Sequence, residues 1–227
     1  MVEAARQRAE SLAVLDQQVA RTITALRDSG ELSNTYVLFT SDNGYFQGEH
    51  RMRQGKTLPY EPSLRTPLVM RGPGIPHGVT RAAPFLTIDF APTILQAARA
   101  GLRSSIDGQN RLGVARRGGS AWKRPVLTET GPRGTVVIAG DSGPRLQLGA
   151  AAAPDDKPFS VGVRTPRFLF VRHLSGEVEL YDMRRDPDQW RNVAGQSPYA
   201  SEQRRMAQIL HDLRHCAGPE CRRQHSS

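Results

Sequence analysis

Apolar residues recur at spacings of three and four over residues 3–28, with charged and polar residues between them. They are Leu12, Leu15, Val19, Ile23 and Leu26. This period predicts an amphipathic helix with one face directed at a core. Ser29 and Gly30 follow as a helix stop signal.

Residues 35–40 are a continuous β-branched and aromatic run, which is typical of a strand buried on both faces of a parallel sheet. Residues 66–71 predict a second short buried strand, followed by a Gly- and Pro-rich turn at 72–76. Between the strands, residues 44–62 show little periodicity. A loop of this length inside a compact domain is usually functional or disordered.

Residues 87–98 predict a helix with Asp89 as its cap and Pro92 in its first turn. Farther along, residues 101–121 and 139–158 have the composition of loops or weakly ordered linkers. The other predicted elements are strands at 126–129, 136–138, 160–164, 167–171 and 177–181, a hairpin connection at 174–176, and a helix at 199–215.

These elements predict an α/β core over residues 1–120 and a small α+β domain over residues 121–227, with an antiparallel sheet and a helix. Hydrophobic residues make up 38% of the 227 positions, and there are 21 glycines in addition, as is normal for a globular protein. This composition excludes wholesale disorder, collagen and coiled coil. No apolar run approaches the roughly 20 residues of a membrane span, and no export signal is visible.

The formal net charge is +9, which is compatible with nucleic acid, a membrane surface or a sulfated or phosphorylated partner. Only three of the 31 basic residues are lysines, namely Lys56, Lys123 and Lys157. The arginines are scattered and never form a run of five, whereas a nucleic-acid footprint is usually clustered. We therefore favour a general arginine bias and expect no nucleic-acid or membrane partner.

Asp42, Asn43 and Gly44 come directly after the first predicted strand. Ligands of open α/β sheets bind beyond the carboxyl ends of strands, and a carboxylate beside an amide offers hard oxygen ligands for Ca²⁺ or Mg²⁺. Lys56 supplies a compact ammonium that can stand beside a metal and a tetrahedral anion. By itself, Asp-Asn-Gly is an ordinary turn sequence.

Several longer motifs occur in order along the chain. They are Tyr-Val-Leu-Phe-Thr-Ser-Asp-Asn-Gly-Tyr at 36–45, Gly-Glu-His at 48–50, Gly-Lys at 55–56, Tyr-Glu at 60–61, Arg-Thr-Pro-Leu-Val-Met-Arg-Gly-Pro-Gly at 65–74, Ile-Asp-Phe-Ala-Pro-Thr-Ile-Leu at 88–95 and Glu-Leu-Tyr-Asp-Met at 179–183. Together they closely resemble the sulfatase family, nearest to bacterial arylsulfatases and the N-acetylglucosamine-6-sulfatase-like branch. The resemblance extends from residue 1 to about residue 221.

The resemblance implies part of an alkaline-phosphatase-like core, with a mostly parallel sheet and flanking helices, and a small antiparallel C-terminal subdomain. It implies hydrolysis of sulfate esters of small molecules or glycans, with a formylglycine nucleophile and Ca²⁺, or alternatively Mg²⁺. Asp42 and Asn43 match family metal ligands, and Lys56 matches the lysine that holds the sulfate. His50 matches a polar position near substrate in some branches, although a structural loop histidine is an equal alternative.

The family's nucleophile motif, Cys or Ser followed by x-Pro-x-Arg, does not occur in this sequence. The first pair of metal aspartates and the histidine that assists the leaving group, which belong near the family's amino terminus, are not represented either. We therefore expect the chain to be a carboxy-terminal portion of a sulfatase that is inactive alone.

Two other functions stay open. Phosphodiesterases and phosphonate hydrolases share the superfamily, but they often have histidine where this chain has Asn43, which favours a sulfatase. The third possibility is a non-catalytic module whose arginines bind sulfated glycans. The sequence specifies neither the sulfate ester nor the oligomeric state.

Cys216 and Cys221 lie close together at the end of the last predicted helix. Their spacing fits either a short disulfide or two free thiols. The resemblance to exported sulfatases favours the disulfide and an exported, periplasmic or secreted full-length protein. Expressed as it stands, without a visible signal peptide, the chain would be cytoplasmic.

Overall fold

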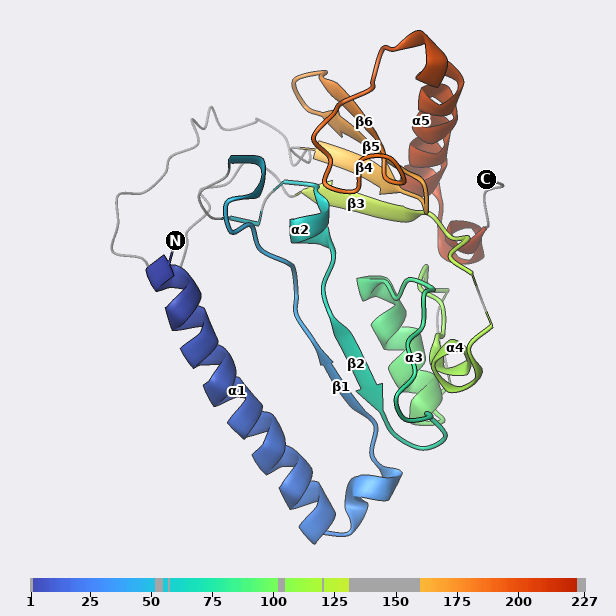
Figure 1. The fold of residues 1–227 in the computed structure, drawn as a ribbon. Helices are drawn as coiled ribbons and strands as arrows, with labels where there is room; N and C mark the ends of the chain where they lie inside the picture. Colours follow the sequence, from blue (N-terminus) through green and yellow to red (C-terminus); the bar gives the residue numbers. More distant parts are fainter. Residues whose placement is uncertain are drawn as a thin grey trace. The chain divides into compact units, whose positions relative to one another are not determined.

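A computed structural model describes residues 2–51, 55–56, 58–101, 105–119, 121–130 and 160–223 of this chain (Figure 1). The chain divides into two compact units. The first comprises Met1–Lys56 and Arg65–Ala121, and the second comprises Thr57–Leu64 and Trp122–Ser227. The short segment at 57–64 therefore belongs to the second unit although it interrupts the first, which the predicted domain limits at 120 and 121 do not anticipate.

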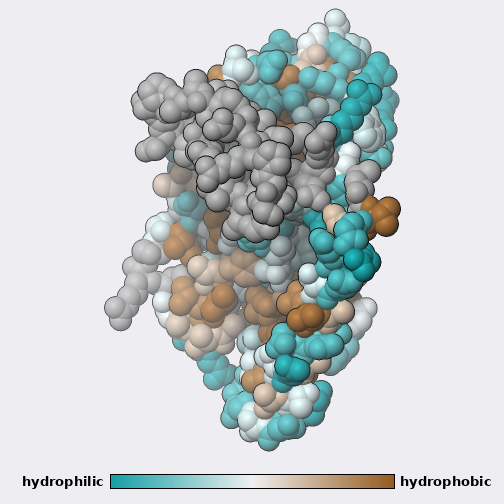
Figure 2. Space-filling view, turned by 90° about the vertical axis from the view of Figure 1, so that its left-hand side faces the viewer, coloured by the Kyte–Doolittle hydropathy of each residue, from teal (hydrophilic) through white to brown (hydrophobic). Residues whose placement is uncertain are grey.

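The first unit begins with α1 (Val2–Asp28), which matches the predicted helix. The helix ends at Asp28. Two residues later, Gly30 has a φ of 77°, a left-handed conformation that glycine adopts at little cost, and η1 (Glu31–Asn34) follows. No residue of α1 is buried. Hydrophobic side chains are exposed on the surface (Figure 2), and Leu12, Val14 and Leu15 of α1 belong to the exposed set. The predicted core-facing stripe thus exists in the sequence but has no core beneath it in the described chain.

The next element, β1 (Val37–Thr40), pairs antiparallel with β2 (Leu68–Arg71), with Val37 opposite Arg71 and Thr40 opposite Leu68. The prediction that this segment lies in a parallel sheet and is buried on both faces is therefore wrong for the described chain. Parallel neighbours need a crossover connection, usually a helix of a dozen or more residues. In the described part of the connection between β1 and β2, the helical segments are the short helices η2 (Glu49–Arg51) and α2 (Glu61–Leu64). Val37, Leu38 and Phe39 are half-buried and Thr40 is exposed.

The remaining helical segments in the described part of the first unit are η3 (Thr87–Asp89), α3 (Phe90–Ala97) and α4 (Leu112–Arg117). Pro92 lies in the first turn of α3, as predicted. Asp89 does not cap α3 through its side chain, which corrects the predicted role. Its fully buried carboxylate accepts the backbone N–H groups of Leu86, at 3.1 Å, and Gln109, at 2.7 Å, and so fastens the chain at Gln109 to the start of the helix.

The helix α4 lies where the sequence predicts a loop, and that prediction is wrong. Its six residues include two arginines and one glycine, which give no strong helical period. Leu112 is buried, and the backbone N–H of Arg111 donates to Thr93 Oγ1 on α3 at 2.9 Å. Tertiary contacts of this kind stabilise short helices that local sequence does not specify.

The second unit contains a four-stranded antiparallel sheet in the order β3-β4-β5-β6. Its strands are β3 (Val126–Thr130), β4 (Ser160–Arg164), β5 (Phe168–His173) and β6 (Val178–Asp182). The turn η4 (Ser197–Tyr199) leads into α5 (Ala200–His215). These four strands and the closing helix confirm the prediction, while the predicted strand at 136–138 and the linker at 139–158 lie outside the described residues.

Both faces of this sheet are covered. Phe168 and Phe170 of β5 point toward α5 and join a core with Met206, Ile209 and Leu210. The alternate residues Leu169 and Val171 join Tyr181 and Met183 in a second cluster, against which Tyr60 and Leu64 pack. Because successive strand residues point to opposite faces, β5 contributes to both layers, and α2 occupies the face that α5 leaves open.

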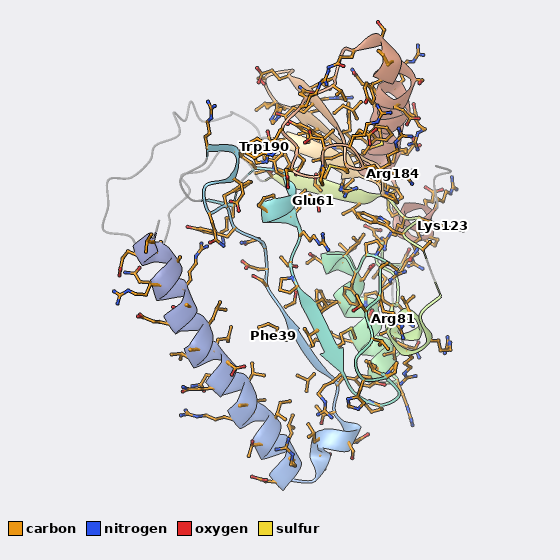
Figure 3. The ribbon with its side chains drawn as sticks, in the orientation of Figure 1. Phe39, Glu61, Arg81, Lys123, Arg184 and Trp190 are labelled. Carbon is orange, nitrogen blue, oxygen red and sulfur yellow. A yellow bond between two sulfur atoms is a disulfide. The ribbon has the colours of Figure 1, made fainter. Side chains whose placement is uncertain are left out.

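Two polar contacts of Glu61 further fix α2 to the second unit. The Glu61 carboxylate accepts from Arg164 Nε at 2.7 Å, and its backbone N–H donates to Gln189 Oε1 at 2.9 Å. Glu61 is labelled on α2 in Figure 3. The interruption at 57–64 is thus held by side-chain packing and by hydrogen bonds to two separate parts of the second unit.

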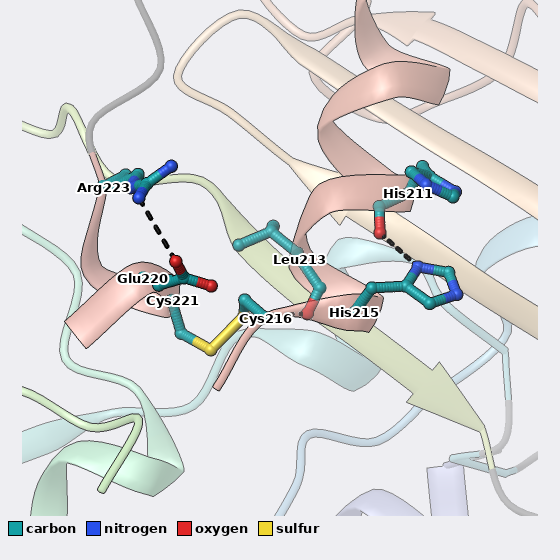
Figure 4. Close-up of a disulfide and its surroundings, with 7 residues drawn as sticks. All are labelled: His211, Leu213, His215, Cys216, Glu220, Cys221 and Arg223. Atoms are coloured by element: carbon teal, nitrogen blue, oxygen red, sulfur yellow. Dashed lines mark hydrogen bonds and ion pairs between the residues drawn. A yellow bond between two sulfur atoms is a disulfide. The ribbon is translucent and has the colours of Figure 1, made fainter. Parts of the chain in front are cut away.

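Cys216 and Cys221 form a disulfide between the end of α5 and η5 (Gly218–Arg222) (Figure 4). Beside it, Arg223 and Glu220 form an ion pair at 3.3 Å. Cys221 is buried. None of the helices among the described residues combines the length and the apolar character needed to cross a membrane.

Candidate functional site

The chain turns sharply where β1 ends, and local side chains hold this turn. Ser41 Oγ donates to the backbone oxygen of Asn43 at 2.8 Å, and the backbone N–H of Asn43 donates to Asp42 Oδ1 at 3.0 Å. Short polar side chains that bond to nearby backbone are the usual reason why Ser, Asp and Asn favour turns. The turn therefore fixes the Asp42 carboxylate just beyond the strand.

Asp42 and Asn43 present oxygen atoms at this turn. The Asp42 side chain is 81% exposed, so its carboxylate is accessible to a cation or to solvent. Asn43 Nδ2 donates to the backbone oxygen of Gly44 at 2.9 Å. Because the amide nitrogen is engaged in this way, the amide oxygen is the atom that Asn43 can offer to a ligand.

A buried aromatic residue brings Lys56 to the same turn. The backbone N–H of Phe46 donates to the oxygen of Gly55 at 2.8 Å, which makes an isolated antiparallel bridge, and the Phe46 side chain is fully buried. Lys56 follows immediately, with Nζ 3.7 Å from Asp42 Oδ2. Two residues that lie 14 positions apart in sequence are thus joined in space.

The ion pair between Lys56 and Asp42 contributes little stability by itself. The two side chains are 48% and 81% exposed, and pairs at such positions are worth about 0–1 kcal/mol. Its importance lies in the arrangement, because a carboxylate that can hold a cation stands beside an ammonium that can hold an anion.

His50 lies in the same loop, half-buried, with its ring edge-on to Phe46 at 6.2 Å between centroids. Its backbone φ of 52° lies in the left-handed region, which few residues other than glycine adopt. This ring contact joins His50 to Phe46, the residue that anchors the loop. Its predicted position near substrate stays a prediction.

The loop also makes a contact with α1 that the sequence does not predict. Arg8 of α1 places its guanidinium carbon 4.2 Å from the centre of the Tyr45 ring, a cation–π contact. Nothing in the helical pattern distinguishes Arg8 from the other charged residues of α1, so the sequence carries no signal for it.

The loop also holds its own acidic residue in place. The backbone N–H of Gln47 donates to Glu49 Oε2 at 2.5 Å, and this bond lowers the pKa of the Glu49 carboxyl. Glu49 is exposed, so the bond orders the loop rather than a core.

The oxygen ligands at the turn are of the type that a hard cation binds, but they are too few to complete its coordination. Ca²⁺ takes six to eight oxygen ligands in proteins. Asp42 and Asn43 supply a carboxylate and an amide oxygen, and among the residues that the structure describes, no cluster of three or more His, Cys, Asp or Glu suits a metal. The turn is therefore suited to form one part of a cation site.

Comparison with known proteins identifies the family. Residues 3–100 match the sulfatase family model. N-acetylglucosamine-6-sulfatase from Capra hircus is 32% identical over 233 residues, which cover 96% of this chain and 41% of that protein. The chain belongs to the sulfatase family. N-acetylglucosamine-6-O-sulfatase from Bacteroides thetaiotaomicron is 31% identical over 87% of this chain and 33% of that protein.

Solved structures support the same fold. The structure of BT4656 in complex with its substrate D-glucosamine-2-N,6-O-disulfate gives a TM-score of 0.73 at 29% identity, over 89% of this chain and 38% of that one. A phosphonate monoester hydrolase of Agrobacterium radiobacter gives 0.71 at 27% identity, over 89% and 39%. The predicted alkaline-phosphatase-like α/β fold class is confirmed. The chain spans about two fifths of the length of these sulfatase relatives.

Proposed function

We propose that this chain contributes part of the metal- and sulfate-binding site of a sulfatase that hydrolyses sulfate esters. Asp42 and Asn43 hold a divalent cation, and Lys56 holds the sulfate group. The observation that carries the proposal is the approach of Lys56 Nζ to within 3.7 Å of the Asp42 carboxylate at the carboxyl end of β1. The match of residues 3–100 to the sulfatase family supports it.

The chemistry of these groups suits a sulfate ester. A bound cation supplies Lewis-acid polarisation of the sulfate oxygens. Lys56 places a compact ammonium group against the same anionic group. Asp42 orients that ammonium through their ion pair, so the position of the anion is set by residues on both sides of the loop.

Ca²⁺ is the proposed cation, with Mg²⁺ as the alternative. Ca²⁺ accepts irregular sets of oxygen ligands, whereas Mg²⁺ demands near-octahedral geometry. An exposed carboxylate and an amide on a turn suit the irregular coordination of Ca²⁺ better than the octahedral geometry of Mg²⁺.

The nucleophile is a different matter. Formylglycine forms in the family at a Cys or Ser followed by x-Pro-x-Arg, and this sequence contains no such motif. The residues present therefore do not fit that group, and no step is derived through it. We propose that the chain by itself turns over no sulfate ester.

The substrate class is proposed to be a sulfated saccharide. The relatives named above act, by their names, on N-acetylglucosamine 6-sulfate groups, and the BT4656 structure holds a disulfated glucosamine. Export of the protein is proposed as well. The Cys216–Cys221 disulfide suits an oxidising compartment, and one relative is named a putative extracellular sulfatase, from Caenorhabditis elegans.

A phosphonate monoester hydrolase is the second candidate, because one such enzyme shares the fold at 27% identity. The same lysine would then hold a phosphonate oxygen. Methylphosphonate and sulfate distinguish the two candidates in a binding experiment, since a sulfatase site should favour sulfate.

The test is a nuclear magnetic resonance titration of the whole chain with inorganic sulfate and, separately, with methylphosphonate. The expected result is that sulfate shifts the signals of residues 42–44 and 56, and that Lys56→Ala weakens this binding about tenfold, as loss of a charged contact does. Lys123→Ala is the matched control, because Lys123 is also an exposed lysine but lies in the second unit. Equal weakening by both variants would contradict the proposal.

A further inference from the structure

A cavity of about 640 Å³ lies within the second unit, lined from β5, β6, the turn that follows β6 and the start of α5. Its lining includes Arg167, Arg185 and Arg191, together with Asp182, Asp186 and Tyr199. None of these residues belongs to the candidate site at residues 42–56. The cavity is therefore distinct from the candidate site.

The carboxylates of the lining are already engaged. Asp182, which is buried, accepts from Arg167 Nη2 at 3.1 Å. Asp186 accepts the backbone N–H groups of Trp190 and Arg191, at 3.0 and 2.8 Å. The third lining carboxylate, Glu202, forms an ion pair with Arg205, with 2.9 Å between Oε2 and Nε.

Two arginines of the lining, Arg185 and Arg191, and one carboxylate, Asp186, have no ion-pair partner among the residues that the structure describes. Arg185 Nη1 donates to the Tyr199 hydroxyl at 3.3 Å, which orients the guanidinium and leaves most of its donors to other partners. The lining therefore has more accessible cationic than anionic hydrogen-bonding groups.

The turn that carries Arg185 is held rigidly. The backbone oxygen of Asp182 accepts the N–H groups of Arg185, at 2.9 Å, and Asp186, at 2.8 Å, while Asp182 Oδ1 accepts that of Arg184 at 3.2 Å. Farther along, the N–H of Gln189 donates to the Asp186 oxygen. A preordered backbone lowers the entropy cost of ligand binding.

We propose that this cavity binds a sulfated saccharide, with its sulfate group held by Arg185 and Arg191. Guanidinium groups bind tetrahedral oxyanions through paired, charge-assisted hydrogen bonds. The volume lies within the range of small-molecule pockets, roughly 300–1,000 Å³, and so accommodates a sugar ring in addition to the anion. Tyr199 adds an aromatic wall with a hydroxyl. The choice of sulfate over phosphate rests on the proposed function.

The experiment follows the arginine Nε–Hε signals of the whole chain by nuclear magnetic resonance during titration with D-glucosamine-2-N,6-O-disulfate. Parallel titrations use inorganic sulfate, glucosamine 6-phosphate and uncharged N-acetylglucosamine. The expected result is that the disulfate shifts the Arg185 and Arg191 signals at the lowest concentration, and that added salt weakens the binding.

Variants locate the site. Arg185→Gln with Arg191→Gln is expected to raise the dissociation constant at least tenfold, since each charged contact is worth about a factor of ten. Arg204→Gln is the control, because Arg204 is exposed on α5 and is not part of the lining. All three arginines are exposed, so the fold should survive, and circular dichroism checks this.

Each remaining outcome overturns the proposal. Equal affinity for inorganic sulfate or for glucosamine 6-phosphate would contradict a sulfated-saccharide site, as would shifts produced by uncharged N-acetylglucosamine. Lys56→Ala should leave the Arg185 and Arg191 shifts unchanged. Loss of disulfate binding in Lys56→Ala but not in the arginine variant would refute this cavity as the site while leaving the proposed function intact.

Discussion

Glu179 on β6 accepts hydrogen bonds from two tyrosine hydroxyls and contacts a histidine ring. Tyr60 donates at 3.1 Å and Tyr181 at 3.0 Å, and His173 Nε2 lies 3.0 Å from the carboxylate. Burial, reinforced by the negative charge of Glu179, raises the pKa of Tyr60 to about 12 and raises the pKa of Tyr181 well above its usual value. The cluster fastens residue 60 to a strand more than 100 positions away.

This cluster predicts a loss of stability in alkali. In the unfolded chain the tyrosines ionise near pH 10, whereas the folded chain keeps Tyr60 protonated until about pH 12. The unfolded state is thus stabilised by ionisation first, and the free energy of unfolding should fall as the pH rises from 10 to 12. Tyrosinate absorbance should show that Tyr60 and Tyr181 ionise late.

The control for this prediction is Tyr45→Phe, because Tyr45 lies in the first unit, whereas Tyr60 and Tyr181 lie in the second. Tyr60→Phe should reduce the alkaline loss of stability, and Tyr45→Phe should not. Ionisation of Tyr60 and Tyr181 near pH 10 would show that their hydroxyls are not held by Glu179.

At this scale the sequence reveals residues within one motif and misses partners in distant ones. Asp42, Asn43 and Lys56 are proposed from two neighbouring motifs, at 36–45 and 55–56, and the structure brings Lys56 to Asp42. Tyr60 and Glu179 also occur in recognised motifs, but no spacing rule links residues so far apart. Arg8 stays hidden among other exposed charges for the same reason.

Elements joined by short hairpins are predicted well. The turn between β5 and β6 is only a few residues long, so the register follows from the local alternation. The partner of β1 is β2, which lies beyond the long connection at residues 41–67. The apolar run at 35–40 indicates that the strand is partly buried, but it does not indicate whether the partner strand is parallel or antiparallel. The parallel assignment fails there because pairing is set by a distant strand.

Two leucines on different helices predict opposite results. Leu210 of α5 is 1% exposed in the core of the second unit, so Leu210→Ala should cost about 2–5 kcal/mol in the free energy of unfolding. Leu12 of α1 is 62% exposed, so Leu12→Ala should change that free energy by no more than about 0.5 kcal/mol.

Chemical denaturation of the two variants measures both effects. Far-ultraviolet circular dichroism follows the helices, and Trp122 and Trp190 report on the second unit. A large cost for Leu12→Ala would mean that the apolar stripe of α1 is packed against another surface in solution, contrary to the structure.

The whole chain divides into two units, and it spans about two fifths of the length of its sulfatase relatives. Family membership and fold class follow from motifs that are spread along the chain, which explains why the sequence predicts them. The division is harder to predict, because residues 57–64 leave the first unit to pack on the sheet of the second. That exchange depends on packing around Tyr60 and Leu64, not on a change in composition.

Catalysis is predicted to be absent from the chain alone. Incubation with a chromogenic aryl sulfate and Ca²⁺, and with an aryl phosphonate monoester, should give no turnover above buffer, because no formylglycine motif is present. Turnover that disappears in Lys56→Ala but persists in Lys123→Ala would prove this prediction wrong.

The cation itself gives the most direct test of the account. A magnetic resonance titration of the chain with Ca²⁺ should shift the signals of residues 42–44 with weak affinity, roughly millimolar, because the turn offers only two side-chain ligands among the residues that the structure describes. Asp42→Asn should abolish these shifts, and Asp16→Asn, at an exposed position on α1, should preserve them. Absence of any Ca²⁺-dependent shift at residues 42–44, or shifts that survive Asp42→Asn, would contradict the assignment of this turn as part of a sulfatase metal site.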